Sequence, residues 1–502
     1  MEKQRNGTAD IAPVSGLPRY QLRIGGRAQA PASGEYFPSE NPYTAENWCE
    51  VARGGAEDVE RAVAAAHEAQ KIWWAMLPAE RGRLLNRLAD VIAENSQFLG
   101  EIDCRDNGKT LIENAYQGHF AANWLRYYAG LADKMEGAVP MPERPGFFSY
   151  SRYEPMGVIG MITPWNSPVM LLANKLAPAL AAGNAAVIKP SEFTSASTIE
   201  LAGLVEQAGL PAGIVNVVTG FGHEAGAALV DHPGITKIAF TGSEPGGVRI
   251  YENAARSLKY VSLELGGKSP NIVFEDANLE AAAMGALGGI FTAGGQTCIA
   301  GSRLLVQRSV HDRLVARMVE VAQTARLGDP TDPDTNMGPV ANPPQYDKVL
   351  KYIEIAKSEG AVCATGGKAS PVGKYFIEPT IFTNVHNKMR IAREEVFGPV
   401  LSVITFDDEQ EAIAIANDSE YGLAAGIWTS DMGRAIRAAE QIRSGNIWIN
   451  TYRIGGHSLP FGGFKRSGIG REGGIGAMKE FMESKTVIMG LDPSQANPFG
   501  MR

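Results

Sequence analysis

Cysteine is scarce in this sequence, with four residues among 502. Cys49, Cys104, Cys298 and Cys363 are scattered, and neither they nor the seven histidines have the short spacings that are typical of metal ligands. Isolated thiols are typical of a reducing compartment, where disulfides are rare. We therefore expect a cytoplasmic protein without a metal site, in which Cys298 alone has a reactive context.

Basic residues are also in the minority, because 47 Lys and Arg face 55 Asp and Glu and give a formal net charge of −8. This charge argues against nucleic acid or an anionic membrane as the main partner. The most apolar region, 158–188, is interrupted by prolines, asparagines and a lysine, so it cannot cross a bilayer as one helix. Residues 1–10 are polar and lack the apolar segment of a secretory signal.

The order of apolar segments predicts an α/β fold. A chain of 502 residues is too long for one ordinary hydrophobic core, so we expect two or three domains. Short β-type segments alternate with helical ones from residue 158 onward, which predicts parallel sheets covered by helices. The expected strands are 158–162, 185–188, 214–218, 238–240 and 260–263 in a first domain, and 303–306, 401–406, 426–429 and 446–449 in a second. Segments 147–153 and 485–489 fit neither alternation and could be ordinary edge strands.

No G-x-G-x-x-G dinucleotide fingerprint opens a helix in the first alternation of strands and helices. The nearest match, Gly220 to Gly226, has its last glycine one residue late, and a tight strand-to-helix turn explains it better. Phe240-Thr241-Gly242-Ser243 is a stronger anion site, because a strand ends and a helix begins there. Lys189-Pro190-Ser191-Glu192 ends the second strand, where an acid binds the adenosine ribose. The Glu192 carboxylate would repel a 2′-phosphate, which favours NAD and leaves NADP as the weaker alternative.

Two glycine-containing segments carry the reactive groups. Cys298 follows Phe291-Thr292-Ala293-Gly294-Gly295-Gln296-Thr297, and Glu264 precedes Leu265-Gly266-Gly267-Lys268. A thiolate attacks a carbonyl carbon, and a carboxylate activates the water that releases the acyl group. We expect a helix N-terminus or a nearby cation to increase the thiolate fraction of Cys298.

These segments closely resemble the two active-site signatures of the aldehyde dehydrogenase family. The resemblance extends over roughly residues 20 to 490 and includes Thr163-Pro164-Trp165-Asn166, Glu395-Val396-Phe397-Gly398-Pro399 and the run from Pro460 to Gly468. It implies an NAD-dependent oxidation of an aldehyde to a carboxylic acid, through a thiohemiacetal and a thioester on the cysteine, in a catabolic pathway.

The resemblance also implies a division into domains. A Rossmann-like, parallel-sheet NAD-binding domain is expected at 1–134 and 154–265, with a return at 459–479. A second α/β domain, the catalytic one, is expected at 266–458. A small β oligomerisation arm, 135–153 and 480–502, would join subunits into homodimers or homotetramers.

The same resemblance implies the roles of individual residues. Cys298 is the nucleophile, Glu264 the base for water, and Asn166 with the Cys298 backbone N–H the pair of oxyanion donors. Lys175 and Glu472 match a proton relay behind Glu264, although a surface ion pair explains them equally well. The residues expected to bind NAD are Ile162, Thr163, Pro164, Trp165, Lys189, Ser191, Glu192, Gly222, Phe240, Gly242, Ser243, Leu265, Glu395 and Phe397.

The substrate tunnel departs from the common family pattern. Many members have an aromatic residue after the oxyanion asparagine and another about two helical turns later, where this chain has Ser167 and Asn174. Tyr452 and Arg453, near the expected tunnel mouth, add hydrogen-bonding groups. A polar, cyclic or hydroxylated aldehyde, or a lactol, is therefore expected. The tunnel residues are Ser167, Met170, Asn174, Thr297, Tyr452 and His457.

Three other functions are open at this stage. A CoA-acylating dehydrogenase would keep the cysteine but would not need Glu264. A catalytically inactive structural relative would tolerate the loss of Cys298, Glu264 or Asn166, and all three are present. A redox-sensing or ligand-binding cysteine would need no hydride acceptor, whereas three cofactor segments are intact.

Overall fold

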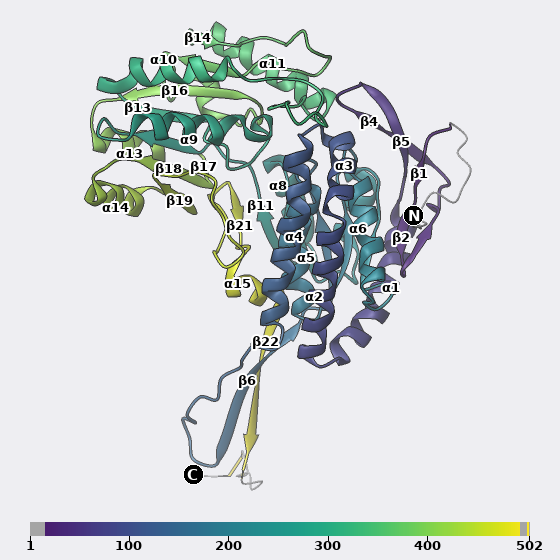
Figure 1. The fold of residues 1–502 in the computed structure, drawn as a ribbon. Helices are drawn as coiled ribbons and strands as arrows, with labels where there is room; N and C mark the ends of the chain where they lie inside the picture. Colours follow the sequence, from purple (N-terminus) through teal and green to yellow (C-terminus); the bar gives the residue numbers. More distant parts are fainter. Residues whose placement is uncertain (1–15, 492–498, 501–502) are drawn as a thin grey trace.

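The computed structural model describes residues 16–491 and 499–500. The expected absence of a secretory signal at residues 1–10 lies outside these residues, as do the ends of the expected domains at 1–15, 492–498 and 501–502. Two sheets packed with helices form the two main lobes, and a two-stranded ribbon extends away from them (Figure 1). The α/β class predicted from the alternating pattern is confirmed.

The larger sheet has eight strands in the order β21-β11-β10-β7-β8-β9-β2-β3. Its five central strands, β11, β10, β7, β8 and β9, run parallel. β21 at one edge and β2 and β3 at the other join the sheet through antiparallel pairing. The strand order reverses between β7 and β10, and such a reversal opens a crevice at the carboxyl ends of the strands. The strands are β2 (Leu22–Ile24), β3 (Arg27–Gln29), β7 (Val158–Ile162), β8 (Ala185–Lys189), β9 (Val215–Val217), β10 (Lys237–Thr241), β11 (Tyr260–Glu264) and β21 (Gly468–Ile469).

Buried apolar residues explain why the central strands form. Every residue of β7, β8, β9 and β10 is buried, which is typical of parallel strands covered on both faces. Helices that pack in this lobe include α4, whose start is fixed by a capping box between Thr110 and Glu113. The helical elements of this lobe are α1 (Ala56–Ala75), α2 (Pro78–Glu94), α3 (Ser96–Asn107), α4 (Leu111–Leu131), α5 (Pro168–Ala181), α6 (Ala196–Gln207), η1 (Gly222–Gly226), α7 (Ala227–Asp231), α8 (Glu244–Ala255) and α15 (Gly474–Lys479).

The second sheet has seven strands in the order β14-β15-β16-β13-β12-β18-β19 and is parallel except at β14. Its strands are β12 (Pro270–Val273), β13 (Arg303–Gln307), β14 (Val362–Thr365), β15 (Thr380–Thr383), β16 (Val400–Phe406), β18 (Ala424–Trp428) and β19 (Asn446–Ile449). Its helical elements are α9 (Leu279–Phe291), η2 (Thr292–Gly295), η3 (Arg308–Val310), α10 (His311–Ala322), α11 (Pro343–Ser358), α12 (Arg390–Arg393), α13 (Glu409–Asn417) and α14 (Met432–Gln441).

Smaller sheets complete the fold. β1 (Arg19–Tyr20), β5 (Glu46–Ala52) and β4 (Tyr36–Asn41) form one of them, and β17 (Tyr421–Gly422) pairs with β20 (Phe464–Lys465). The projecting ribbon pairs β6 (Phe147–Pro155) with β22 (Met482–Gly490), two segments that are distant in sequence. Within the described part of the chain, no helix is both long and apolar enough to cross a membrane.

Candidate active site

The nucleophile loop, residues 292–299, lies between α9 and β13. It opens with η2, where residues 293–295 have left-handed backbone conformations with φ of 56°, 58° and 71°. A Cβ atom at Gly295 would lie 2.0 Å from the carbonyl oxygen of Gly398, so only glycine fits there. The glycine pair seen in the sequence therefore makes the tight turn that precedes Cys298.

Asn166, which follows β7 of the larger sheet, binds the nucleophile loop. Its Nδ2 donates to the backbone oxygen of Gln296 at 2.8 Å, and its side chain is buried. A side-chain amide has a second N–H donor, which remains for another acceptor. The Gln296 side chain in turn accepts from the backbone N–H of Ala341 at 2.9 Å. The structure thus brings Asn166 to the loop that carries Cys298.

Two consecutive residues after β19 hold both ends of the nucleophile loop. The Tyr452 hydroxyl donates to the carbonyl oxygen of Ile299 at 3.0 Å. The Arg453 guanidinium donates through Nη1 to the carbonyl oxygen of Thr292 at 3.3 Å. Arg453 itself has a left-handed backbone, with φ of 65°. The loop position is therefore set by contacts from a remote segment.

Burial raises the pKa of the half-buried Cys298 thiol to about 12. The carboxylates of Glu395 and Glu264 contribute to this increase, whereas the Arg453 cation opposes it. The expected increase in thiolate fraction is therefore wrong for the protein alone. A cation is present as predicted, but burial and two carboxylates outweigh it, so the thiol keeps its proton near neutral pH.

Glu264 ends β11 inside a buried network of charges. Burial raises the pKa of its carboxyl well above the usual range, the Glu472 carboxylate raises it further, and Lys175 lowers it. Lys175 Nζ is paired with Glu472 Oε1, and Asn174 Nδ2 donates to Glu472 Oε2 at 3.0 Å. These side chains are buried, so the surface ion-pair interpretation of Lys175 and Glu472 is wrong. Lys175 also donates to the hydroxyl of Thr241.

The segments predicted to bind the dinucleotide lie at the carboxyl ends of the larger sheet's strands. Residues 162–166 lie at the end of β7 and residues 240–243 at the end of β10, on the two sides of the reversal in strand order. Ser243 caps α8 by accepting from the N–H of Gly246 at 3.4 Å. The Thr163 hydroxyl is buried without a hydrogen-bond partner among the described residues. The protein therefore leaves one buried hydroxyl at this crevice without a hydrogen bond.

The other residues predicted to bind NAD follow β8, β9 and β11. Lys189 Nζ at the end of β8 pairs with Glu192 Oε2 at 3.2 Å. Ser191 lies between them and accepts from the N–H of Phe193 at 3.3 Å. Gly222 opens η1 after β9, and no atom lies within 4 Å of an added Cβ there, so close packing does not require this glycine. Leu265, after β11, is buried.

Glu395 and Phe397 come from the second lobe and face this crevice. Glu395 Oε1 accepts from the backbone N–H of Gly267 at 3.0 Å, and burial raises its pKa. The ring of Phe397, whose backbone φ is 59°, meets that of Trp165 edge to face at 5.3 Å. The two lobes therefore approach each other through predicted cofactor residues.

The residues predicted for the substrate tunnel occupy different settings. Ser167 Oγ accepts from Lys109 Nζ at 3.0 Å and is buried. Met170 on α5 and Thr297 beside the nucleophile are half-buried, and Tyr452 is buried. The His457 ring packs against Tyr127 and Trp124, with ring centroids 4.9 and 6.4 Å away. Asn174 belongs to the Glu472 network described above.

Several groups at the site were missed in the sequence. Glu113 Oε1 accepts from the N–H of Ala293 in the nucleophile loop at 2.8 Å, and Lys109 reaches Ser167. Thr110-x-x-Glu113 is a recognisable capping box, but its pattern shows only that a helix starts there. Burial lowers the pKa of Lys268 to about 7, and its Nζ has no hydrogen-bond partner among the described residues.

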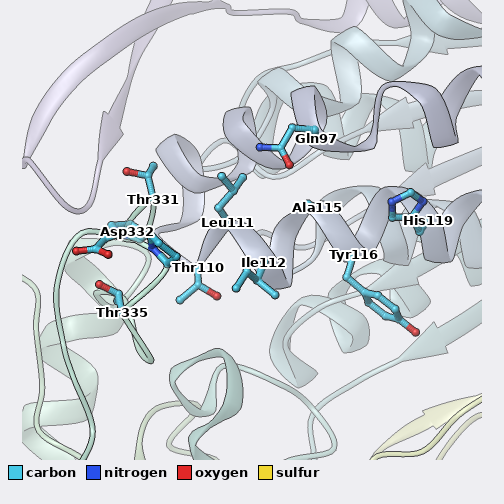
Figure 2. Close-up of a pocket in the computed structure, with 12 residues that line it drawn as sticks. Gln97, Thr110, Leu111, Ile112, Ala115, Tyr116, His119, Thr331, Asp332 and Thr335 are labelled. Carbon is cyan, nitrogen blue, oxygen red and sulfur yellow. The ribbon is translucent and has the colours of Figure 1, made fainter.

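A cavity of about 420 Å³ lies between α3, α4 and the loop 330–335 (Figure 2). Its side chains include Leu111, Ile112 and Tyr116 on α4. None of the predicted site residues lines it. The reactive groups are therefore separate from this cavity.

Comparisons with known proteins agree with this geometry. The model of the family described as "Aldehyde dehydrogenase family" matches residues 29–487. The chain is 46% identical to a betaine aldehyde dehydrogenase of Brucella anthropi over 477 residues, covering 94% of this chain and 97% of that protein. The chain belongs to the aldehyde dehydrogenase family. Human retinal dehydrogenase 2 is 44% identical over 476 residues, which cover 93% of this chain and 91% of that protein.

Solved structures support the same membership. A betaine aldehyde dehydrogenase from Staphylococcus aureus, crystallised with NAD+, superposes with a TM-score of 0.93 at 39% identity. The match covers 96% of this chain and 97% of that one. The predicted family, the aldehyde dehydrogenase-like fold and the expected class of enzyme are thereby confirmed.

Proposed function

We propose that this aldehyde dehydrogenase oxidises an aldehyde to a carboxylic acid with NAD, through a covalent intermediate on Cys298. One observation carries the proposal: the loop that bears Cys298 is bound by the Asn166 amide and lies close enough to Glu264 for its carboxylate to raise the thiol pKa. A nucleophile, an amide donor and a buried carboxyl therefore converge on one point.

The crevice at the strand-order reversal fits a dinucleotide. The start of α8 offers backbone N–H groups for a pyrophosphate, and the Lys189–Glu192 pair offers both signs of charge for a ribose. Glu395 would bind the second ribose, and Trp165 and Phe397, whose rings are in contact, would border the nicotinamide. The betaine aldehyde dehydrogenase of S. aureus, crystallised with NAD+, supports NAD as the cofactor.

Different residues of the chain act in successive steps of the proposed reaction. Cys298 loses its proton and attacks the aldehyde carbon, while Asn166 Nδ2 and the Cys298 N–H donate to the developing oxyanion. Bound NAD supplies the hydride acceptor, and a thioester is left on Cys298. Glu264 takes a proton from water, which attacks the thioester and releases the acid. The buried Glu472–Lys175 pair is positioned to pass that proton onward.

We infer that the substrate is polar, cyclic or hydroxylated and is consumed in a catabolic pathway. Ser167 bound to Lys109 and Asn174 bound to Glu472 place polar groups where many relatives have aromatic rings. The buried Glu264 argues against CoA-acylating chemistry, and the intact reactive groups argue against an inactive relative.

The domain boundaries inferred from the sequence are also part of the proposal: a cofactor domain at 1–134, 154–265 and 459–479, a catalytic domain at 266–458, and an arm at 135–153 and 480–502. The ribbon β6–β22 would join subunits into dimers or tetramers. Four unpaired thiols among the described residues fit a reducing, cytoplasmic location.

Two variants test the covalent route. Cys298→Ala should abolish NADH formation and leave NAD binding nearly intact, because the thiol does not hold the cofactor. Glu264→Gln should keep a near-stoichiometric burst of NADH and lose steady turnover by about 10²–10⁴. Mass spectrometry of the quenched Glu264→Gln protein should show the acyl group on Cys298. Steady turnover by Cys298→Ala would refute the proposal.

A further inference from the structure

The positive charge of Arg453 lies beside the nucleophile loop, and its guanidinium has few partners among the described residues. Among the described residues, its guanidinium forms no ion pair, and its one hydrogen bond is the 3.3 Å contact from Nη1 to the carbonyl oxygen of Thr292. A guanidinium presents a fork of several N–H donors, most of which are therefore unused. The residue is half-buried, and burial lowers the pKa of its guanidinium.

The surroundings of Arg453 place it next to the reacting groups. Its charge acts on the Cys298 thiol, whose pKa it lowers, and on the ammonium of Lys109. Lys109 in turn donates to Ser167, which directly follows the oxyanion asparagine. The guanidinium therefore contacts the nucleophile loop and is close enough to both Cys298 and Lys109 for its charge to act on them.

The carboxylate that attracts Arg453, that of Glu113, already accepts other hydrogen bonds. Glu113 Oε1 accepts from the N–H of Ala293 at 2.8 Å, and its Oε2 accepts from the N–H and hydroxyl of Thr110 at 3.3 and 3.0 Å. Glu113 attracts Arg453 electrostatically but makes no ion pair with it among the described residues. A carboxylate that arrives with a substrate therefore meets an unpaired guanidinium.

Arg453 has a constrained backbone conformation. Its φ of 65° is a left-handed conformation that long side chains rarely adopt. Tyr452, immediately before it, is buried and bonded to the carbonyl oxygen of Ile299 at 3.0 Å. The backbone at Arg453 is therefore fixed before any ligand binds, which reduces the ordering cost of recognition.

We propose that Arg453 binds a carboxylate at the far end of the substrate, so that the preferred aldehyde is an oxo acid. This inference rests on the proposed function and specifies the polar substrate class further. A planar guanidinium matches a carboxylate through two parallel N–H donors and repels a cation. A positively charged aldehyde such as betaine aldehyde should therefore be a poor substrate, although a relative is named for it.

The test compares matched aldehydes on the wild-type enzyme with NAD. Succinate, glutarate and adipate semialdehydes are each paired with the corresponding methyl ester, which has the same reach without the charge, and betaine aldehyde supplies the opposite charge. At the best chain length, kcat/KM for the acid should exceed that for its ester by about 10- to 100-fold, the effect of one charged hydrogen-bonded pair. This ratio should fall as salt is added.

Variants then separate recognition from loop positioning. Arg453→Gln keeps a donor for Thr292 but loses the charge that lowers the Cys298 pKa, so it should slow acids and esters, and acids far more, until the acid-to-ester ratio is about one. Arg453→Lys should keep part of the preference. Tyr452→Phe is the matched control: it removes the hydrogen bond to Ile299 and should slow acids and esters alike.

The remaining outcomes overturn the inference in recognisable ways. Equal losses with acid and ester in Arg453→Gln would make Arg453 a positioning residue for the loop. Equal activity of wild-type enzyme with acids and esters would show that no carboxylate is recognised. If the wild-type enzyme oxidised none of these aldehydes, esters included, the proposed function itself would fail.

Discussion

Glu264 and Cys298 both hold their protons more tightly than the same groups would in water. Burial is the largest cause in each case, and neighbouring carboxylates add to it. Both groups act in the reaction only after they lose that proton. The environment of each group therefore opposes the loss of the proton that the reaction requires.

A pH profile follows from these shifts. A raised pKa means that the proton is lost only as the pH rises, so turnover should increase as the pH is raised above neutral. Glu472→Gln removes a charge that raises the Glu264 pKa and should move the deacylation limb to lower pH. Steady-state and burst rates measured on both sides of neutral pH check both statements. Turnover that is greatest near pH 6 and falls with rising pH would contradict them.

Glu192 should set the choice between NAD and NADP. Its carboxylate is 3.2 Å from the buried ammonium of Lys189 and would lie near a ribose 2′-substituent. Glu192→Gln should weaken NAD binding and improve NADP use, because it removes repulsion of the 2′-phosphate and leaves Lys189 free. Titration of both cofactors against both proteins measures the ratio. Glu280→Gln, an exposed acid paired with Arg317, is the control. An unchanged ratio would mean that Glu192 does not contact the ribose.

At the scale of elements, the site depends on close approach between backbones. Gly267, after β11, has room for no side chain, because a Cβ there would lie 2.7 Å from the carbonyl oxygen of Cys298. The nucleophile loop is thus packed directly against the segment that carries Glu264. The two segments can approach this closely because Gly267 has no side chain.

Gly267→Ala should displace the nucleophile loop. We expect a loss of about 1–3 kcal/mol in the free energy of unfolding and at least about a tenfold fall in kcat. Gly288→Ala on α9 is the matched control, since no atom lies within 4 Å of its added Cβ and alanine favours a helix interior by roughly 0.5–1 kcal/mol. Thermal melts and NADH kinetics on both variants make the comparison. Full activity in Gly267→Ala would show that the loop tolerates the shift.

At the scale of the whole molecule, the ribbon β6–β22 projects away from both lobes (Figure 1). It exposes Phe148 and Met489, which are paired across the two strands. A two-stranded ribbon alone is marginally stable in water, and its free edges favour pairing with another chain. These features support the proposal that the ribbon joins subunits.

Met489→Asp should weaken that assembly. Light scattering after gel filtration should show a shift towards smaller species, together with a lower Tm, because a charge would be buried at the contact. Ile436→Asp, an equally simple change at an exposed position on α14, should leave the mass unchanged. An identical mass for all three proteins would place the subunit contact elsewhere.

The larger elements were predictable because their cause is local. Buried runs such as Val158–Ile162 consist of β-type apolar residues, and the segments between them have helical character. Short edge strands such as Arg27–Gln29 were missed, because three largely exposed residues carry no period. They are strands only because a neighbouring chain segment pairs with them.

The sequence by itself determined the alternating order of strands and helices, the reactive motifs around Cys298 and Glu264, and the polar replacements at Ser167 and Asn174. Only the tertiary structure decided how these groups behave. The pKa of the Cys298 thiol and the burial of the Lys175–Glu472 pair depend on which distant segments surround them. The same holds for Arg453, which lies far from Thr292 in sequence yet bonds to it. Electrostatics depends on distance and burial in space, and neither can be read from sequence spacing.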